Sequence, residues 1–322
     1  MTTNGETSGV PAAAEEFRPA AQRSRSGIEN IFMGPHGIRA GWRLLLFIFL
    51  MFVCLKGEGF TLKHVPGVDA WFKAQNPNVM TPPTTIAFEG ILLLALVIST
   101  AVMALVEKRT YADYYLPMNQ FLGKRFWQGV PYGFAMLSLA LGLIAALHGF
   151  SLGSVALPEA DALKFGALYG IAFLMVGLFE EFSFRGYMQA TLGPSIGFWP
   201  AAIVLSFFFG AIHLSNGGEA WFGAAMAGSF GVLASFALQR TGNLWFPIGM
   251  HAAWDWSETF FYSVPDSGFL AKGHLLNSTF HGPTWLTGGT VGPEGSVFAF
   301  LVLIIGGVGI HFIFPKNQIP AS

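Results

Sequence analysis

Two adjacent carboxylates and an arginine stand inside an apolar stretch of this chain. Glu180 and Glu181 follow a run of apolar residues that begins near Leu163, and Arg185 comes four residues after Glu181. Positions four apart share one face of a helix, so Glu181 is expected to pair with Arg185. Glu180 then projects elsewhere and is left to take a proton from water, as a general base does. The alternative is that both carboxylates serve only as structural partners of Arg185.

Two histidines follow in later apolar stretches. His213 closes the first of these stretches, with Phe209 four residues earlier on the same helix face. A single histidine on an apolar helix is more often a core residue than a catalytic one. Its expected depth favours chemistry, because Gly and Pro at 193–197 predict a turn. An antiparallel helix pair around that turn brings His213 level with Glu180.

His251 and Asp255 are four residues apart in a third apolar stretch, so they share a helix face. An aspartate beside a histidine commonly fixes the tautomer of the imidazole, and a purely structural pair is the alternative here. Charged groups in hydrocarbon cost roughly several kcal/mol each, and they usually face a protein interior and serve chemistry or transport. Three polar groups of this kind in one chain predict a single site around one buried water.

The composition of the chain predicts an integral membrane protein. Hydrophobic residues make up 53% of it and charged residues only 11%, whereas a soluble domain carries roughly 25% charged residues. The net charge of −1 gives no indication of a nucleic-acid partner. Cys54 is the only cysteine, which excludes an intrachain disulfide and a thiolate metal cage.

The apolar runs predict an all-α, polytopic fold with about eight transmembrane helices, because a helix needs roughly 20 residues to cross the hydrocarbon core. The expected spans lie near residues 40–56, 85–106, 127–149, 162–185, 198–213, 219–238, 243–262 and 296–314. They form a single transmembrane domain at 27–322. Residues 1–26 are rich in small and polar residues and predict a disordered cytoplasmic tail.

The distribution of Lys and Arg predicts the orientation of these spans. Most of the 17 Lys and Arg residues fall in the tail, in the connection between the second and third spans, and at other span ends on the same side. The positive-inside rule therefore puts both termini in the cytoplasm, with the bacterial inner membrane as the expected location. The loop 263–295 would face outward, and the sequence assigns it no role.

The three polar stretches together resemble the ordered motifs of a known family, the CAAX protease and bacteriocin-processing (Abi) family. The type II CAAX prenyl endopeptidases belong to it. The resemblance covers residues 162–262. The matching motifs are Glu180-Glu181-x-x-x-Arg185, Phe209-x-x-x-His213 and His251-x-x-x-Asp255.

The resemblance implies an intramembrane endopeptidase. Members of the family have been interpreted both with and without a metal, and glutamate catalysis without a metal cofactor is the expectation favoured for this chain. Glu180 and His213 would activate the water, and His251 with Asp255 would hold the oxyanion. The supporting residues would be Glu181, Arg185 and Phe209. The implied partners are the lipid bilayer and a peptide or protein substrate, which is prenylated for some members of the family.

Asp255 departs from the resemblance, because the family usually has Asn at this position. Asn can donate a hydrogen bond to an oxyanion, whereas an ionised Asp only accepts. Three solutions stay open. Asp255 is protonated, or it orients His251 as the donor, or the site holds zinc on His213, His251 and Glu180, since two histidines and a carboxylate can bind this metal.

Two other functions remain as alternatives. Intramembrane Glu, His, Asp and Arg also build the proton relay of a proton-coupled transporter, although the inverted repeats of many carriers are not evident in the sequence. A catalytically idle immunity or scaffold protein of the same family is the second alternative. The presence of every ionisable residue of the three motifs argues against it.

Overall fold

The computed structural model describes residue 27 and residues 29–34, 37–76, 79–216 and 220–320. The predicted tail at 1–26 lies outside these residues. The chain divides into two compact units, Met1–Arg39 and Ala40–Ser322. In the first, α1 (Glu29–Phe32) precedes the antiparallel pair of β1 (Met33–Gly34) and β2 (Gly37–Ile38).

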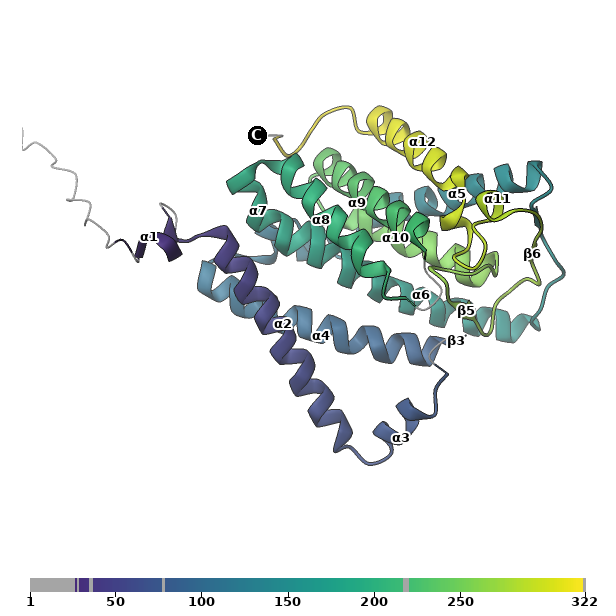
Figure 1. Ribbon diagram of the computed structural model, residues 1–322, viewed down its shortest axis with the longest axis horizontal. Helices are drawn as coiled ribbons and strands as arrows, with labels where there is room; N and C mark the ends of the chain where they lie inside the picture. Colours follow the sequence, from purple (N-terminus) through teal and green to yellow (C-terminus); the bar gives the residue numbers. More distant parts are fainter. Residues whose placement is uncertain (1–26, 28, 35–36, 77–78, 217–219, 321–322) are drawn as a thin grey trace, which may run out of the picture. The chain divides into compact units, whose positions relative to one another are not determined.

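The second unit is built almost entirely of helices (Figure 1). Its larger elements are α2 (Ala40–Lys63), α4 (Pro82–Glu107), α5 (Lys124–Ala146), α6 (Glu159–Glu181), the π-helix η3 (Phe182–Met188), α7 (Gln189–Ile196), α8 (Phe198–His213), α9 (Trp221–Thr241), α10 (Trp245–Trp256), the π-helix η4 (Ser257–Phe261) and α12 (Val297–Ile313). Its short elements are α3 (Val68–Lys73), β3 (Val79–Met80), η1 (Tyr111–Tyr114), η2 (Met118–Gln120), β4 (Phe150–Ser151), β5 (Leu270–Ala271), β6 (Thr279–Phe280), α11 (Thr284–Thr287) and η5 (Pro293–Gly295).

Five of the described helices are long and apolar enough to cross a membrane, namely α2, α4, α5, α9 and the continuous segment Glu159–Ile196. Helices α8 and α12 are apolar but shorter. The protein is therefore an all-α integral membrane protein, as its composition predicts, and the count of eight spans stays a prediction.

One predicted boundary is wrong. The span expected at 162–185 continues through η3 and α7 to Ile196. The predicted turn is confined to Gly197, whose φ of 92° is one that glycine adopts without strain. Pro194, part of the turn signal, lies inside the helix instead.

Helix α10 lies at the centre of the second unit, in contact with α5, α6 and α9. Every residue from Trp245 to Asp255 is buried. Glycines allow α5 to approach it closely, since a Cβ on Gly129 or Gly133 would overlap the backbone of α10. Small residues at a membrane helix interface act in this way generally, because they let two backbones meet. Side chains on α10 are therefore held in a closely packed interior.

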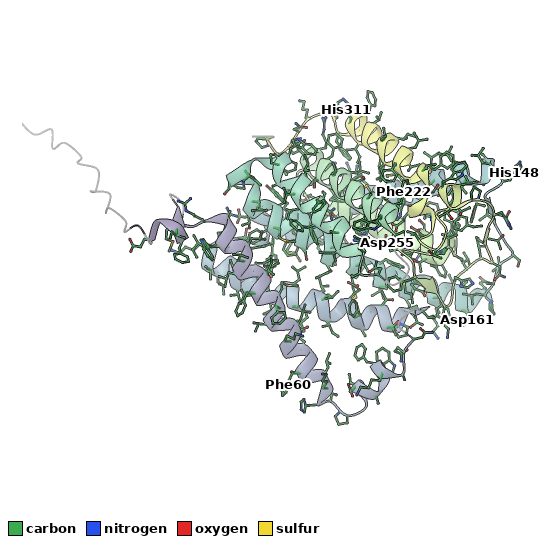
Figure 2. All side chains as sticks on the ribbon, in the orientation of Figure 1. Phe60, His148, Asp161, Phe222, Asp255 and His311 are labelled. Atoms are coloured by element: carbon green, nitrogen blue, oxygen red, sulfur yellow. The ribbon has the colours of Figure 1, made fainter. Side chains whose placement is uncertain are left out.

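The outer helices expose large apolar side chains, as lipid contact requires. Phe52 and Phe60 on α2 and Phe207 on α8 are among the exposed residues. Figure 2 shows Phe60 at the far end of α2, whereas Asp255 lies in the middle of the helical unit and is buried. The apolar outside and polar inside are the arrangement expected for a site within a membrane protein.

The loop 263–295 folds back onto the helical unit. Strand β5 pairs in parallel with β3, and β6 pairs in antiparallel with β4. The backbone N–H of Val264 also donates to the carbonyl of Glu258 at 3.0 Å. These bonds fix the loop near the end of α10 and its π extension.

Candidate active site

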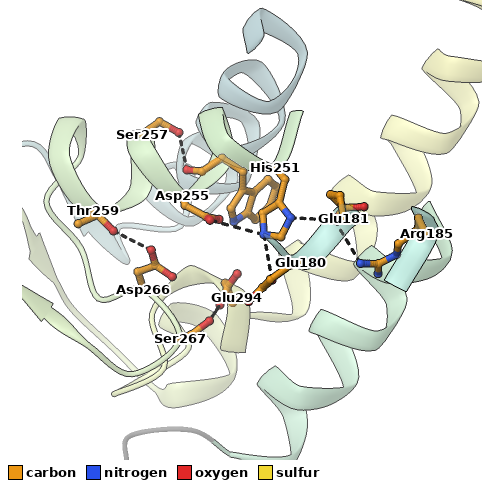
Figure 3. Close-up of polar contacts among 11 residues, drawn as sticks. Glu180, Glu181, Arg185, His251, Asp255, Ser257, Thr259, Asp266, Ser267 and Glu294 are labelled. Carbon is orange, nitrogen blue, oxygen red and sulfur yellow. Dashed lines mark hydrogen bonds and ion pairs between the residues drawn. The ribbon is translucent and has the colours of Figure 1, made fainter. Parts of the chain in front are cut away.

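The ionisable residues of the first and third motifs meet between α6, η3 and α10 (Figure 3). Glu180 and Glu181 end α6, and Arg185 lies in the π-helix that follows directly. His251 and Asp255 lie one turn apart on α10, which also continues as a π-helix. Single π turns within α-helices are frequent at functional sites. Both helices therefore change their winding next to the cluster.

Glu181 is the centre of this cluster. Its Oε1 accepts from Nη1 of Arg185 at 3.2 Å and from Nδ1 of His251 at 2.8 Å. The side chains of Glu181 and Arg185 are 0% and 1% exposed, so the ion pair predicted from the spacing of four is fully buried. Such a pair is stable only when both partners are present, because either charge alone would stay buried and uncompensated.

Glu180 is the carboxylate that remains open. Its side chain is 23% exposed, and its Oε2 lies 3.6 Å from Nε2 of His251. Among the described residues, no ion pair joins it to Arg185. Glu181 therefore forms the ion pair with Arg185 that the spacing of four predicts, and Glu180 keeps part of its side chain exposed.

His251 lies between three carboxylates and two aromatic rings. Its Nδ1 lies 2.8 Å from the carboxylate Oε1 of Glu181, while its Nε2 faces Glu180 at 3.6 Å and Asp255 at 3.5 Å. The ring of Phe230 lies 4.9 Å from the imidazole, measured between centroids. Nδ1–H must donate to Glu181, because the ion-paired carboxylate can only accept. The residue that orients His251 through Nδ1 is therefore Glu181 and not Asp255.

His213 lies at the edge of this cluster. Its Nδ1–H donates to the carbonyl of Phe209 at 2.8 Å, which leaves Nε2 as the nitrogen that can accept a proton. The ring of Phe209 lies 4.6 Å from that of His213 and 6.5 Å from that of His251, measured between centroids. Among the described residues, no ion pair joins His213 to a carboxylate. Whether His213 shares a water with Glu180 stays a prediction.

Phe209 connects the second motif to the first. The guanidinium carbon of Arg185 lies 4.2 Å from the centroid of its ring, a distance at which a cation is attracted to the face of an aromatic ring. Phe209 therefore packs against Arg185 and His213 and lies near His251, and its supporting role stays a prediction.

The predicted zinc ligands do not converge in this arrangement. Among the described residues, one group of three side chains brings possible metal-ligand atoms within 4.8 Å of one another, and it contains neither His213 nor His251. Zinc binds its ligands at roughly 2.0–2.3 Å, so His213, His251 and Glu180 do not fit this ion as they stand.

Sequence reasoning missed two acidic features. Glu89 on α4 is close enough to Glu180 and His251 for their charges to act on it. A lone carboxylate within the apolar run 85–106 was the signal that could have indicated it. The second feature is the group of three carboxylates, Glu258, Asp266 and Glu294. Its members are too far apart in the sequence for any spacing pattern to indicate that they meet.

A comparison with protein families matches residues 162–257 to the family described as type II CAAX prenyl endopeptidase Rce1-like. A comparison with curated proteins gives no match. The matched segment begins in α6 and ends in η4, so it contains all three motifs and every residue predicted for the site. The central segment of this chain thus matches the Rce1-like family of type II CAAX prenyl endopeptidases, which confirms the resemblance carried by its three motifs.

Proposed function

We propose that this protein is an intramembrane endopeptidase in which Glu180 activates the attacking water. The observation that carries the proposal is the contrast between the two glutamates. Glu181 is fully buried and held by Arg185 and His251, whereas Glu180 is partly exposed and forms no ion pair with any arginine that the structure describes. A general base must reach both water and substrate, and Glu180 is the carboxylate of the pair that can do so.

The remaining residues take roles that their contacts support. His213 assists through Nε2, the nitrogen left free by the bond of Nδ1 to Phe209. In its imidazolium form, in which both ring N–H groups donate, His251 stabilises the tetrahedral oxyanion from Nε2 while its Nδ1–H donates to Glu181. Donors fixed in advance toward developing negative charge are the usual source of such stabilisation. Asp255 lies 3.5 Å from the same Nε2 and acts on the oxyanion through His251.

Cleavage by reconstituted protein tests this proposal. Purified protein in lipid vesicles is given quenched membrane peptides, each in a prenylated and an unprenylated form. We expect Glu180→Ala and His213→Ala to abolish cleavage while leaving the unfolding temperature near that of wild type. Cleavage by both variants at the wild-type rate would show that the assignment is wrong. The ratio of rates on the two forms identifies the substrate class.

A chelator experiment tests the zinc alternative. The metal-free proposal expects full activity in a chelator that is selective for transition metals. Loss of activity that zinc alone restores would overturn the glutamate mechanism. The transporter and the idle protein draw no support from the family match, and cleavage that depends on Glu180 would exclude both.

The bacterial inner membrane as location and cytoplasmic termini belong to the same proposal. Reporter fusions at each terminus and in the loop 263–295 test the orientation. Cytoplasmic reporter activity at both termini, and none in the loop, is the expected result.

A further inference from the structure

A second buried acidic group lies one turn beyond Asp255. It consists of Glu258 in η4, Asp266 in the following loop and Glu294 in η5. One carboxylate oxygen from each lies within 4.8 Å of the other two. Glu258 and Asp266 are buried, and Glu294 is half-buried. Figure 3 shows Asp266 and Glu294 beside the cluster that contains Glu180 and Asp255. Glu258, Asp266 and Glu294 are called the acidic triad below.

The carboxylate of Glu258 has no cationic partner in the part of the chain that the structure describes. The residue is 0% exposed, and neither of its oxygens makes a hydrogen bond. The indole N–H of Trp254, one turn earlier, approaches this carboxylate outside normal hydrogen-bond geometry and carries no charge to balance it. Among the described residues, no Lys, Arg or His forms an ion pair with Glu258. A buried carboxylate in this state requires a cation or a proton.

Hydroxyl groups hold the other two members of the acidic triad in place. Thr259 donates to Oδ2 of Asp266 at 2.7 Å, and Ser267 donates to Oε2 of Glu294 at 2.7 Å. Each hydroxyl group engages one oxygen of its carboxylate. Carboxylates that form a metal site are in turn usually oriented by hydrogen bonds of this kind.

We propose that the acidic triad binds one divalent cation of the oxygen-preferring type, Ca²⁺ in preference to Mg²⁺. The ligand set consists of oxygen atoms alone, which suits these ions and not zinc or copper. Ca²⁺ accepts oxygen atoms at roughly 2.3–2.6 Å in flexible geometry, so two ligands on opposite sides lie about 4.8 Å apart. Mg²⁺ demands bonds of roughly 2.0–2.1 Å in a near-ideal octahedron and gives up its waters reluctantly, so carboxylates from three separate segments suit the flexible coordination of Ca²⁺ better.

The bound cation joins three separate parts of the chain. Glu258 continues from α10, whereas Asp266 and Glu294 lie near the two ends of the loop 263–295. The charges of Asp266 and Glu294 also act on Asp255 in the candidate active site. The cation thus fixes the loop to α10 and reduces the negative potential at Asp255. Residues Glu258, Asp266 and Glu294 lie beyond the segment 162–257 that matches the family.

Direct binding measurements test the site independently of peptidase activity. Full-length protein in lipid nanodiscs is freed of metal with a calcium chelator and then titrated with radioactive Ca²⁺. We expect one Ca²⁺ per chain and a rise in the unfolding temperature on the order of 5 °C at saturation, because binding to the folded state alone stabilises it. Mg²⁺ at the same concentration should produce a smaller rise.

Charge-neutral variants make the test specific. Glu258→Gln and Glu294→Gln keep the side-chain shape and should weaken Ca²⁺ binding at least tenfold and remove the thermal response. Glu159→Gln, an exposed residue at the start of α6, is the matched control and should bind as wild type does. If the glutamine variants do not fold, the wild-type titration alone decides.

Two results would overturn the proposal. One is wild-type protein that binds no Ca²⁺ above the level of Glu258→Gln and unfolds at the same temperature in Ca²⁺ and in chelator. The other is a thermal response to Ca²⁺ that persists in both glutamine variants. Either would mean that the carboxylates are neutralised by protons instead.

Discussion

Two groups of buried ionisable side chains lie next to each other on α10 and η4, and their charges are balanced differently. In the candidate active site, Glu181 contacts both Arg185 and His251. In the acidic triad, Glu258 forms no ion pair with a cationic side chain of the described residues. The first group carries its own counterions and leaves one carboxylate, Glu180, open. The second is complete only with an external cation, so similar residues serve chemistry in one place and binding in the other.

The largest expected effect separates Glu180 from the rest of the first group. Glu180→Gln should lower the rate of peptide cleavage by about 10²- to 10⁴-fold, the range for a lost general base. The stability of the variant should change little, because the Glu180 side chain is partly exposed and its carboxylate lies 3.6 Å from Nε2 of His251, beyond hydrogen-bond distance. Cleavage rates and thermal unfolding measured on the same preparation check both statements. If Glu180→Gln lowered the unfolding temperature enough to account for its loss of cleavage, Glu180 would be a structural residue and not the general base.

Arg185→Leu should destabilise the protein by about 3–5 kcal/mol, because it leaves Glu181 charged and buried without its partner. Adding Glu181→Gln to this variant should restore part of the loss, since the orphaned charge is removed. Glu258→Gln in calcium-free protein should not lower stability, because it removes a buried carboxylate that has no counterion there. This is the opposite of what Arg185→Leu should do. Denaturant unfolding of the three variants makes the comparison. A stability loss in Glu258→Gln equal to that of Arg185→Leu would contradict the difference between the two groups.

Both groups depend on the position of α10, which Gly133 tests. A Cβ at this position would overlap the carbonyl of Met250, and overpacking of this kind costs about 1–3 kcal/mol. Gly133→Ala should therefore lower stability and weaken both cleavage and Ca²⁺ binding. Gly142→Ala on the same helix is the control, because its Cβ would meet open space. Identical behaviour of the two variants would show that close contact between α5 and α10 is unimportant.

Thr259→Val tests the support of the acidic triad alone. It removes the hydroxyl that donates to Asp266 at 2.7 Å and keeps the shape of the side chain. A loss of about 1 kcal/mol is expected for one hydrogen bond of this type, together with weaker Ca²⁺ binding. Peptide cleavage measured at saturating Ca²⁺ should stay near the wild-type rate. A variant that binds Ca²⁺ as tightly as wild type would show that Thr259 does not position Asp266.

The smallest effect concerns Asp113, a carboxylate outside the membrane spans that serves as an exposed reference. The backbone N–H and the hydroxyl of Thr110 donate to it, and these bonds lower the pKa of Asp113 below its usual 3.8. A lowered pKa contributes stability above pH 3.8 that is lost as the pH falls through the folded-state value. Asp113→Asn should therefore lower stability slightly at pH 7, and its effect should be smaller at pH 3, where wild type has lost most of this contribution. Unfolding measured at both pH values checks this. A large effect at pH 7 would contradict a local role.

Much of the fold and part of the site could be predicted from the sequence. Apolar runs identified the long helices, because a membrane span must bury its own backbone hydrogen bonds in hydrocarbon. The spacing of four identified the pair of Glu181 with Arg185 and placed His251 beside Asp255. The span expected to end at Arg185 instead continues through a π-helical stretch to Ile196, a change of winding that has no period in the sequence pattern.

The sequence by itself determined the class of protein, the three motifs and the pairs within one helix, since these depend on composition and on local helical geometry. Only the tertiary structure decided that Glu181 orients His251, that Phe209 lies between the two imidazoles, and that Glu258 meets Asp266 and Glu294. Each of these contacts joins residues from different helices or loops. Their distances follow from how α6, α8 and α10 pack, and no spacing along one chain segment specifies that packing.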